Sequence, residues 1–389
     1  MAEVLIVGAG PVGLFMAALL LQSGVRVRVL EQRTERDQHS RAIGIHPPAL
    51  DVLRRIGVAQ ELVAQGVPIR RGIALGGGRQ LAQMSFAGVS YRFPFVLSLP
   101  QSRTEAVLEQ RVRELDPGAL HRGVRLTGLH DDGGRVGVEG SSPAGPVRHS
   151  AALVIAADGV RSAVRTLQGT AVRAKHYPDS YLMGDFADST CFGPDAALFL
   201  APEGIVESFP LPGGLRRWVI RLDRTMPAWN PETNPGPNNL PGACWLAEQV
   251  RERTGIDVDA GSNSMLSSFG VRSRLARRMV TGRTVLIGDA AHEVSPIGGQ
   301  GMNLGWLDAV ALAPLVLAAL QGDGVGAQLR SFERSRMTAA ARAVRQSEFN
   351  MALGRPFGGG LLNIRSHAIA AAAAVPAVNS FVARRFTMQ

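Results

Sequence analysis

The sequence predicts an α/β protein in which an antiparallel sheet is inserted into a parallel-sheet domain and the C-terminal region is helical. Three observations indicate this class. The chain opens with a short apolar strand, a glycine-rich turn and a helix. Two later apolar strands, at residues 153–157 and 285–287, each lead into an aspartate. Residues 177–235 carry strands, prolines and aromatic residues without the strand–helix alternation of a parallel sheet.

The composition is that of an ordinary folded protein. The 389 residues are 46% hydrophobic and 19% charged, which suits two domains or one large α/β unit. The formal net charge is +10, but the basic residues are scattered arginines with Lys175 as the single lysine. Without a basic block or an interleaved aromatic stripe, we expect no nucleic-acid partner.

The cysteines and the apolar segments bear on location. Cys191 and Cys244 form no CxxC pair and no disulfide framework, so a reducing, cytoplasmic location is expected. The apolar N-terminus lacks the basic region of a signal peptide, and no uninterrupted apolar run reaches membrane-spanning length. We therefore expect no transmembrane segment, and we assign no metal site.

Apolar periodicity and punctuating residues define the elements of the first half. Residues 4–7 are predicted to be a buried strand, 14–22 a helix that ends before Gly24, and 25–30 a second strand finishing at Glu31. The pattern then predicts a helix from Pro47 to Gly57, β-like sequence over 71–98, a helix over 104–115 with Glu105, Glu109 and Arg113 on one face, and a hairpin over 123–140.

In the second half, the strand at 153–157 precedes Asp158, Gly159 and a helix capped by Ser162. A Pro- and Asn-rich linker at 230–242, an apolar helix over 301–320 and an Arg-rich helical remainder complete the pattern. The predicted domains are residues 1–70, 99–176 and 270–330 for the parallel-sheet domain, 71–98 and 177–269 for the inserted domain, and 331–389 for the C-terminal helical segment.

The first glycine motif predicts a dinucleotide site. Gly8 permits a tight turn, Gly10 lets backbone approach a pyrophosphate, and Gly13 lets the helix pack on the strand. The helix N-terminus supplies free N–H groups and a positive dipole end. Glu31 is placed to accept hydrogen bonds from ribose hydroxyls. This motif alone does not separate FAD from NAD, and Arg33 hints at a 2′-phosphate.

A second acidic position follows the strand at 285–287. Asp289 lies at the carboxyl end of that strand, where open α/β sheets bind ligands. The following residues are rich in glycine, and the helix beginning near Gly301 points its N-terminus back at the site, where it favours negative charge. Asp289 is therefore predicted to hydrogen-bond a sugar-alcohol chain.

These segments together resemble the single-component FAD-dependent aromatic hydroxylases of the para-hydroxybenzoate hydroxylase type. The motif "GAGPVG" is similar to the adenosine fingerprint of that family, "AADGVRSAVR" to its Asp-Gly motif and "GDAAHEVSPIGGQGMN" to its Gly-Asp motif, in the family's order and spacing. The resemblance covers nearly the whole chain. It implies a Rossmann-like FAD-binding domain of the GR2 type with an inserted antiparallel substrate domain.

The resemblance also implies roles for individual residues. Arg41 and Gln101 would bind the pyrophosphate region, Leu126 would approach the adenine through its backbone, and Asp158 would serve both FAD and the incoming nicotinamide cofactor. Pro296 and the residues from Gly298 to Asn303 would line the isoalloxazine ring. The full set of expected cofactor-binding residues is Gly8, Gly10, Pro11, Val12, Gly13, Glu31, Gln32, Arg33, Arg41, Gln101, Leu126, Asp158, Gly159, Gly288, Asp289, Pro296, Gly298, Gly299, Gln300, Gly301, Met302 and Asn303.

The implied chemistry is hydroxylation of an aromatic small molecule. NADPH or NADH would reduce noncovalently bound FAD, and reaction with O2 would give a C4a-hydroperoxide that transfers one oxygen atom to a phenolic, quinone-type or polyketide-like ring. No side chain is assigned as catalytic from the sequence. His292 is interpreted as a packed or capping histidine, and His46 is a weaker candidate near the flavin. The oligomeric state is left as a monomer or a homodimer.

Other functions remain open at this point. An epoxidase or a prenyl-lipid reductase shares the FAD motifs, and a halogenase shares the fold but carries a WxWxIP segment that is absent here. A non-catalytic flavin-binding protein is a further alternative. The apolar tail ending in Arg384 and Arg385 is expected to pack on the FAD domain, with a membrane-surface helix as the alternative.

Overall fold

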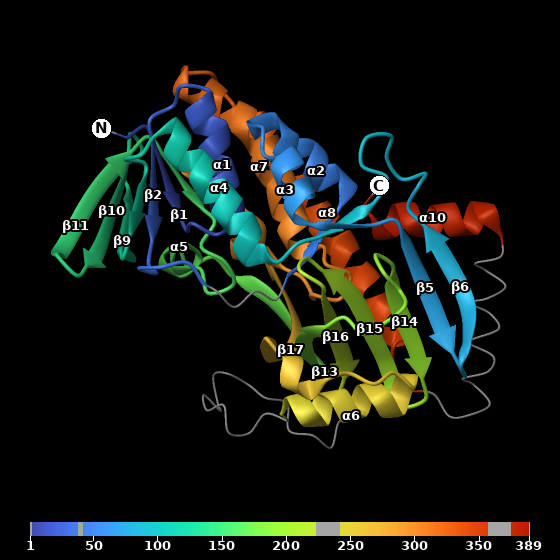
Figure 1. Ribbon diagram of the computed structural model, residues 1–389. Helices are drawn as coiled ribbons and strands as arrows, with labels where there is room; N and C mark the ends of the chain where they lie inside the picture. The colour runs from blue at the N-terminus through green and yellow to red at the C-terminus, as the bar shows by residue number, and fades with distance from the viewer. Residues whose placement is uncertain (1, 38–41, 223–241, 357–374, 389) are drawn as a thin grey trace.

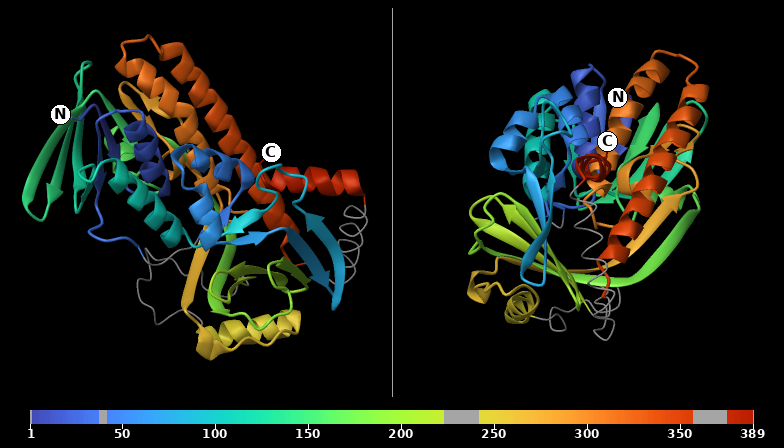
Figure 2. Two further views of the ribbon diagram at one scale, coloured as in Figure 1. Left: turned by 45° about the horizontal axis from the view of Figure 1, so that its top comes forward. Right: turned by 90° about the vertical axis from the view of Figure 1, so that its right-hand side faces the viewer.

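The fold is described from a computed structural model, which places residues 2–37, 42–222, 242–356 and 375–388. Arg41, nearly all of the predicted linker and residues 357–374 of the tail lie outside the described residues. Figure 1 shows a helix-rich half and a large sheet below it, and Figure 2 shows the same two halves from other sides. These halves correspond to the parallel-sheet and antiparallel-sheet regions that the sequence predicts.

A mainly parallel sheet forms the core of the first half. Its order is β18-β19-β12-β1-β2-β8, and every neighbouring pair except the edge pair β18–β19 is parallel. Its strands are β1 (Val4–Val7), β2 (Val27–Glu31), β8 (Leu120–Arg122), β12 (Leu153–Ala156), β18 (Val280–Thr281) and β19 (Thr284–Leu286). The central strand β1 is buried along its whole length, as expected for an uninterrupted apolar run.

Helices cover this sheet. They are α1 (Pro11–Gln22), α2 (Pro47–Leu53), η1 (Arg54–Ile56), α3 (Ala59–Gln65), α4 (Gln101–Leu115), α5 (Ala163–Leu167), α7 (Gly301–Leu320) and α8 (Gly326–Leu353). Both α1 and α4 begin about one turn before the predicted positions, because Pro11 occupies the first turn of α1 and Pro100 caps α4. The Ser162 hydroxyl accepts the N–H of Arg165, which confirms the predicted cap of α5.

Two small sheets complete this half. The predicted hairpin is part of a three-stranded sheet, β9 (Arg125–Asp131), β10 (Val136–Ser142) and β11 (Gly145–Ala151), at the end of the molecule away from α10 (Figure 1). Its third strand was not predicted because its glycine, proline and serine are typical of loops. A second sheet joins β3 (Gly44–Ile45), β7 (Val96–Ser98) and β4 (Val67–Ile69).

The other half is built on a sheet of order β20-β17-β13-β16-β15-β14-β5-β6, in which only β14 and β5 run parallel. Its strands are β5 (Arg71–Gly76), β6 (Arg79–Ser85), β13 (Val172–Ala187), β14 (Ala196–Ala201), β15 (Gly204–Leu211), β16 (Leu215–Arg221), β17 (Met265–Ala276) and β20 (His292–Glu293). The long strands β13 and β17 extend past residues 176 and 270, where the domain boundaries were predicted, and the register of their pairing shifts between His176 and Ser180.

The two faces of this sheet pack against different partners because side chains alternate along each strand. One face, which includes Leu182, Val206 and Trp218, is covered by α6 (Ala243–Thr254) through Leu246 and Val250. The opposite face carries Tyr181, Met183, Ile205 and Val219 and turns toward the helical half. The remaining elements are η3 (Ala260–Ser262), η4 (Gly288–Ala290) and α10 (Pro376–Phe386).

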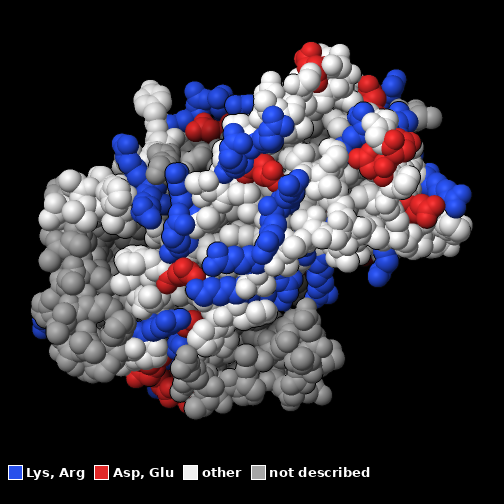
Figure 3. Space-filling model, turned by 180° about the vertical axis from the view of Figure 1, so that it is seen from behind, with Lys and Arg blue, Asp and Glu red and all other residues white. Residues whose placement is uncertain are grey.

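Charged groups are distributed over the surface. Figure 3 shows basic side chains spread across one face with acidic groups among them. Among the described residues, α7 alone is long and apolar enough to cross a membrane by length and composition, which the sequence analysis did not expect. Half of its apolar window is buried inside the protein, and α7 packs against α1, α2 and α8. It therefore serves as a core helix of this fold.

A buried ionic cluster fixes α7 to η4, β20 and α8. Asp308 accepts hydrogen bonds from the Gly288 N–H at 3.0 Å and the Arg336 Nε at 2.7 Å, and its other contact is His292 Nε2 at 2.6 Å. Burial alone would favour a neutral imidazole, but Asp308 raises the pKa of His292. This geometry confirms His292 as a packed histidine, and it ties η4 to α7.

We predict that Asp308→Ala destabilises the fold strongly. Removal of one partner leaves His292 and Arg336 with uncompensated charge in the interior, which costs about 3–5 kcal/mol of unfolding free energy. Urea unfolding followed by circular dichroism measures the loss. The control is Asp323→Ala, an exposed aspartate in the turn after α7, which should change the midpoint little. Equal midpoints for the two variants would contradict the assigned role.

Candidate active site

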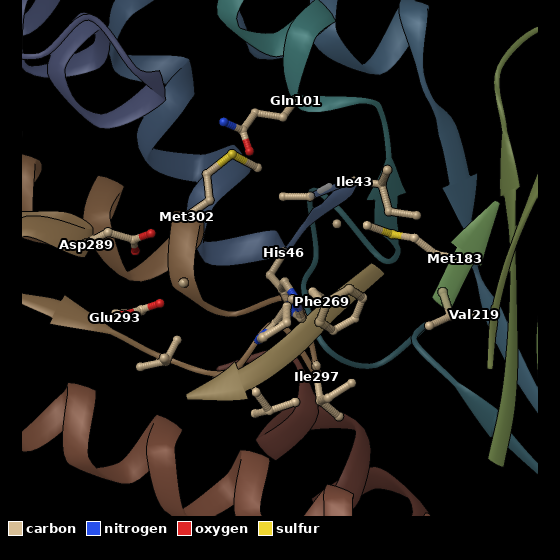
Figure 4. Close-up of a pocket in the computed structure, with 18 of the residues that line it drawn as sticks. Ile43, His46, Gln101, Met183, Val219, Phe269, Asp289, Glu293, Ile297 and Met302 are labelled. Atoms are coloured by element: carbon tan, nitrogen blue, oxygen red, sulfur yellow. The ribbon is translucent and has the colours of Figure 1, made fainter. Parts of the chain in front are cut away.

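A cavity of about 1520 Å³ lies between the carboxyl ends of the parallel strands and the inner face of the large sheet. Val7, Leu30, Ala157 and Ile287 line it from the ends of four parallel strands or the residues just after them. In Figure 4, Asp289, Glu293 and Met302 lie on one side and Met183 and Val219 on the other, with His46 and Phe269 between them. One half of this cavity is therefore made by the parallel-sheet region and the other by the large sheet.

The three glycines of the first motif have different structural reasons. A side chain at Gly8, which has φ of +102°, would overlap the carbonyl oxygen of Ala157, and one at Gly13 would overlap the Gly8 carbonyl. These two residues are required by packing alone. Gly10 has φ of −76°, and a methyl group there would meet nothing within 4 Å. The open space at Gly10, at the N-terminus of α1, leaves the helix N–H groups accessible from the cavity.

Glu31 closes this loop from the end of β2. Its carboxylate accepts the Ala9 N–H at 2.7 Å and both the N–H and the Nε of Arg33, at 2.9 and 3.0 Å. Burial opposes ionisation, but these hydrogen bonds and the Arg33 charge lower the pKa of Glu31. Arg33 is thus engaged by Glu31. The ionised carboxylate lies at the cavity wall beside the glycine loop, a position suited to ribose hydroxyls.

Asp289 also lines the cavity, in η4 at the end of β19, and its neighbour Gly288 packs against Val12 of the glycine loop. A methyl group built on Gly301 would lie 3.6 Å from Asp289 Oδ1, so this carboxyl is close to the N-terminus of α7. Burial raises its pKa to about 6, and the carboxyl groups of Glu293 and Asp308 oppose its ionisation further while His292 favours it. A hydroxyl donor that enters the cavity would stabilise the ionised form of this buried carboxyl by a hydrogen bond.

Asp158 and Gly159 line the cavity after β12. Asp158 Oδ2 accepts the Val164 N–H at 3.1 Å, and Oδ1 is buried with no hydrogen-bond partner among the residues that the structure describes. Burial raises the pKa of Asp158. An unpartnered buried carboxylate oxygen at a cavity wall is a feature that a bound hydroxyl or amide N–H would satisfy.

Asn303 ties the glycine loop to the entrance of α2. Its Oδ1 accepts the His46 N–H at 2.8 Å, and its Nδ2 donates to the carbonyls of Gly44 and Gly299, at 3.0 and 2.7 Å. Asn303 is fully buried and is absent from the cavity wall, so it holds the loop from behind. Gly298 and Gly299 in that loop have φ of +97° and +64°, which glycine adopts without strain.

The structure brings most of the predicted residues together at one cavity. Of the predicted set, the cavity wall includes Gly8, Gly10, Pro11, Val12, Glu31, Gln32, Arg33, Gln101, Leu126, Asp158, Gly159, Asp289, Pro296, Gly298, Gly299, Gly301 and Met302. Four others, Gly13, Gly288, Gln300 and Asn303, lie behind this wall.

Sequence reasoning missed several polar residues that face the cavity. The Glu105 carboxylate on α4 accepts a hydrogen bond from Gln101 Nε2 at 2.8 Å. The Glu293 carboxylate on β20 accepts one from Arg272 Nε at 2.7 Å. Glu207 lines the large-sheet side. The sequence could have indicated Glu207, because it is an acidic residue inside the apolar strand sequence "GIVESFPL". His46, already named as a weaker candidate near the flavin, lines the cavity too. Burial lowers its pKa to about 4, so its imidazole is neutral at physiological pH.

Comparison with known proteins agrees with this geometry. A family model described as an FAD binding domain matches residues 1–347. The chain is 32% identical over 356 residues to rifampicin monooxygenase of Rhodococcus hoagii, with 88% of this chain and 69% of that protein aligned. It is 29% identical over 368 residues to anhydrotetracycline monooxygenase of Streptomyces rimosus, with 89% and 68% aligned. The chain belongs to the family of FAD-dependent aromatic hydroxylases.

Solved structures support the fold of this family member. The crystal structure of p-nitrophenol 4-monooxygenase from Pseudomonas putida DLL-E4 superposes with a TM-score of 0.87 at 24% identity, covering 100% of this chain and 98% of that one. Anhydrotetracycline hydroxylase from Streptomyces rimosus gives 0.77 at 28% identity, covering 100% and 76%. This chain therefore spans about three quarters of the latter structure.

The residues of the cavity fit FAD. Open space at Gly10 admits a pyrophosphate, and the unpartnered Asp158 oxygen and the Asp289 carboxyl are both acceptors for hydroxyl or amide donors. The N-termini of α1 and α7 both border the cavity and favour negative charge. These features suit a ligand that has phosphates at one end and a hydroxylated chain in the middle.

We predict that Gly10→Ala and Gly13→Ala have different effects. Gly10→Ala should leave the melting temperature of the FAD-free protein nearly unchanged and weaken FAD binding, because only the ligand needs the open space. Gly13→Ala should lower the melting temperature, because the new methyl group overlaps backbone. Differential scanning fluorimetry and FAD titration measure the two effects. A strong loss of apoprotein stability in Gly10→Ala would contradict the distinction.

We predict that Asp289→Ala weakens FAD binding about ten- to a hundredfold, the range expected for a hydrogen bond to a charged group. Ligand hydroxyls favour the carboxylate, whose pKa in the free site is about 6. Affinity should therefore fall as the pH drops from about 7 to about 5. Quenching of FAD fluorescence measures both effects, with Asp289→Asn as the matched control that abolishes the contribution of this titration. An unchanged pH profile in Asp289→Asn would show that the pH dependence of FAD affinity arises from another group.

Proposed function

We propose that this protein uses NADPH or NADH and O2 to hydroxylate a phenolic or polyketide-like aromatic compound. The observation that carries the proposal is the division of one cavity into a polar half, which suits FAD, and a half walled by the large sheet. Bound FAD would supply electron transfer from the nicotinamide cofactor to O2 and transfer of one oxygen atom to the ring. The protein supplies binding, orientation and exclusion of water.

The polar half would hold the cofactor through the residues described above. Glu31 would accept the ribose hydroxyls, and Asp289 would accept hydroxyls of the ribityl chain. The loop at Gly298 and Gly299, anchored from behind by Asn303, would place backbone against the isoalloxazine ring. The N-terminus of α7 would stabilise negative charge on the reduced ring.

The other half suits a flat apolar substrate. Met183, Val219, Phe269 and Ile297 line it, and the Phe269 ring stacks on Tyr181 with centroids 5.4 Å apart. Apolar walls of this kind exclude water from the oxygen-transfer step, which reduces unproductive release of peroxide. Relatives named for anhydrotetracycline and rifampicin support a multi-ring substrate for this protein.

We predict that the purified protein is yellow with noncovalent FAD and that an aromatic substrate accelerates its oxidation of NADPH or NADH. The test is a panel of phenol, naphthol and hydroxyanthraquinone with both nicotinamide cofactors. Product mass spectra should show one added oxygen atom, taken from labelled O2. A protein that cannot be reconstituted with FAD would overturn the assignment. FAD binding with no substrate-dependent oxidation across the panel would favour a non-catalytic flavoprotein.

A further inference from the structure

Glu207 is an acidic residue within the apolar wall of the large-sheet half. It lies on β15 between Ile205 and Phe209, and all three line the cavity, whereas the alternate residues Val206 and Ser208 are buried on the α6 side of the sheet. The alternation of β15 therefore directs the Glu207 carboxyl toward the cavity. The Glu207 side chain therefore does not face α6, where Val206 is buried.

The strand register places Glu207 in a row of apolar neighbours. Val219 lies opposite it on β16 and Leu198 on β14. Met183 lies beyond Val219, and Ala74 lies beyond Leu198, and each of these residues also lines the cavity. The row crosses five adjacent strands, β13-β16-β15-β14-β5, and Glu207 is its one ionisable member.

Within the described part of the chain, the Glu207 carboxyl forms no hydrogen bond and no ion pair, and burial alone raises its pKa to about 7. The nearby cation Arg217, on β16, is held by both oxygens of Asp185, at 2.6 and 2.8 Å. A carboxyl without a partner in an apolar wall costs stability, so a residue of this kind commonly serves a ligand.

A second polar group lies near it. Tyr181 on β13 lines the same cavity, and burial together with the charges of Glu207 and Asp179 raises the pKa of its phenol. Tyr181 thus remains a neutral hydroxyl, able to donate or accept. The two groups form a polar position beside the apolar row of Met183, Val219, Leu198 and Ala74.

We propose that Glu207 binds a hydroxyl group on the aromatic substrate, with its carboxylate accepting the hydrogen bond. The inference rests on the proposed function, because it assigns the polar contact within the proposed substrate half. A substrate hydroxyl would satisfy the carboxyl that the fold leaves unpaired, and it would fix which ring edge faces the cofactor side. A ring without that hydroxyl would leave a buried charge unpaired and would bind less well.

The test compares naphthol with methoxynaphthalene, which has the same rings but no hydroxyl donor. Binding to the FAD-loaded oxidised protein is followed by the change in flavin absorbance, so turnover is not needed. We expect Glu207→Gln to weaken naphthol binding about tenfold and to change methoxynaphthalene binding less than about twofold. Glu207→Leu should abolish the preference for naphthol. Glu203→Gln, an exposed charge-matched change at the adjacent hairpin turn, is the control.

The pH dependence gives a second readout. The acceptor is the carboxylate, so wild-type affinity for naphthol should rise as the pH increases from about 6 to about 8, through the pKa of about 7. His46, Asp289, Glu293, Tyr181 and Arg217 also line the cavity, and the charge of Glu207 acts on the Tyr181 phenol. All five are retained in Glu207→Gln, so the part of the profile that disappears in this variant belongs to Glu207.

The outcomes separate the two proposals. If naphthol binds and is oxygenated by the wild-type protein but Glu207→Gln binds it equally well, the role of Glu207 is overturned and the proposed function stands. Affinity that falls with rising pH would likewise overturn it, because a protonated carboxyl would then be donating. If phenol, naphthol and hydroxyanthraquinone all fail to bind the FAD-loaded wild type, both proposals fail.

Discussion

The site depends on one constraint. The two nucleotide-facing loops and the helices that follow them must lie in close backbone contact. Gly13 lets α1 approach the Gly8 turn, and a side chain at Gly305 on α7 would overlap Val12 of α1. At this separation two helix N-termini border the same cavity. The dipoles and free N–H groups of both helices then act on one ligand, which neither helix would achieve alone.

The ionic cluster around Asp308 maintains this arrangement from the interior. Its bond to the Gly288 N–H holds the turn that carries Asp289, and its pairing with Arg336 holds α8 to α7. Asp289 is therefore presented at the cavity by a rigid support. In the same way, Asn303 fixes the loop at Gly299 against the start of α2. Buried polar groups that lie behind the cavity wall thus hold in place the polar groups that face the cavity.

The cavity joins two kinds of surface that come from distant parts of the chain. The parallel-sheet side presents carboxylates and helix N-termini, and the central strands of the large sheet present an apolar row flanked by charged residues such as Arg217 and Arg272. Such a division suits a cofactor that is phosphorylated and hydroxylated at one end and a substrate with flat rings at the other. Glu207 places a carboxyl within the apolar row that crosses β13, β16, β15, β14 and β5, and the proposed hydrogen bond to a substrate hydroxyl would orient the ring there.

The sequence by itself determined the elements with strong local signals. The strand at Val4–Val7, the glycine turn, the cap at Ser162 and the helix from Gly301 follow from apolar runs and from residues with special backbone preferences. The tertiary structure alone decided which residues meet: that Asn303 lies behind its loop, that His292 pairs with Asp308, and that Glu207 faces the cavity. These outcomes depend on strand register and helix packing between distant segments, which local periodicity does not encode.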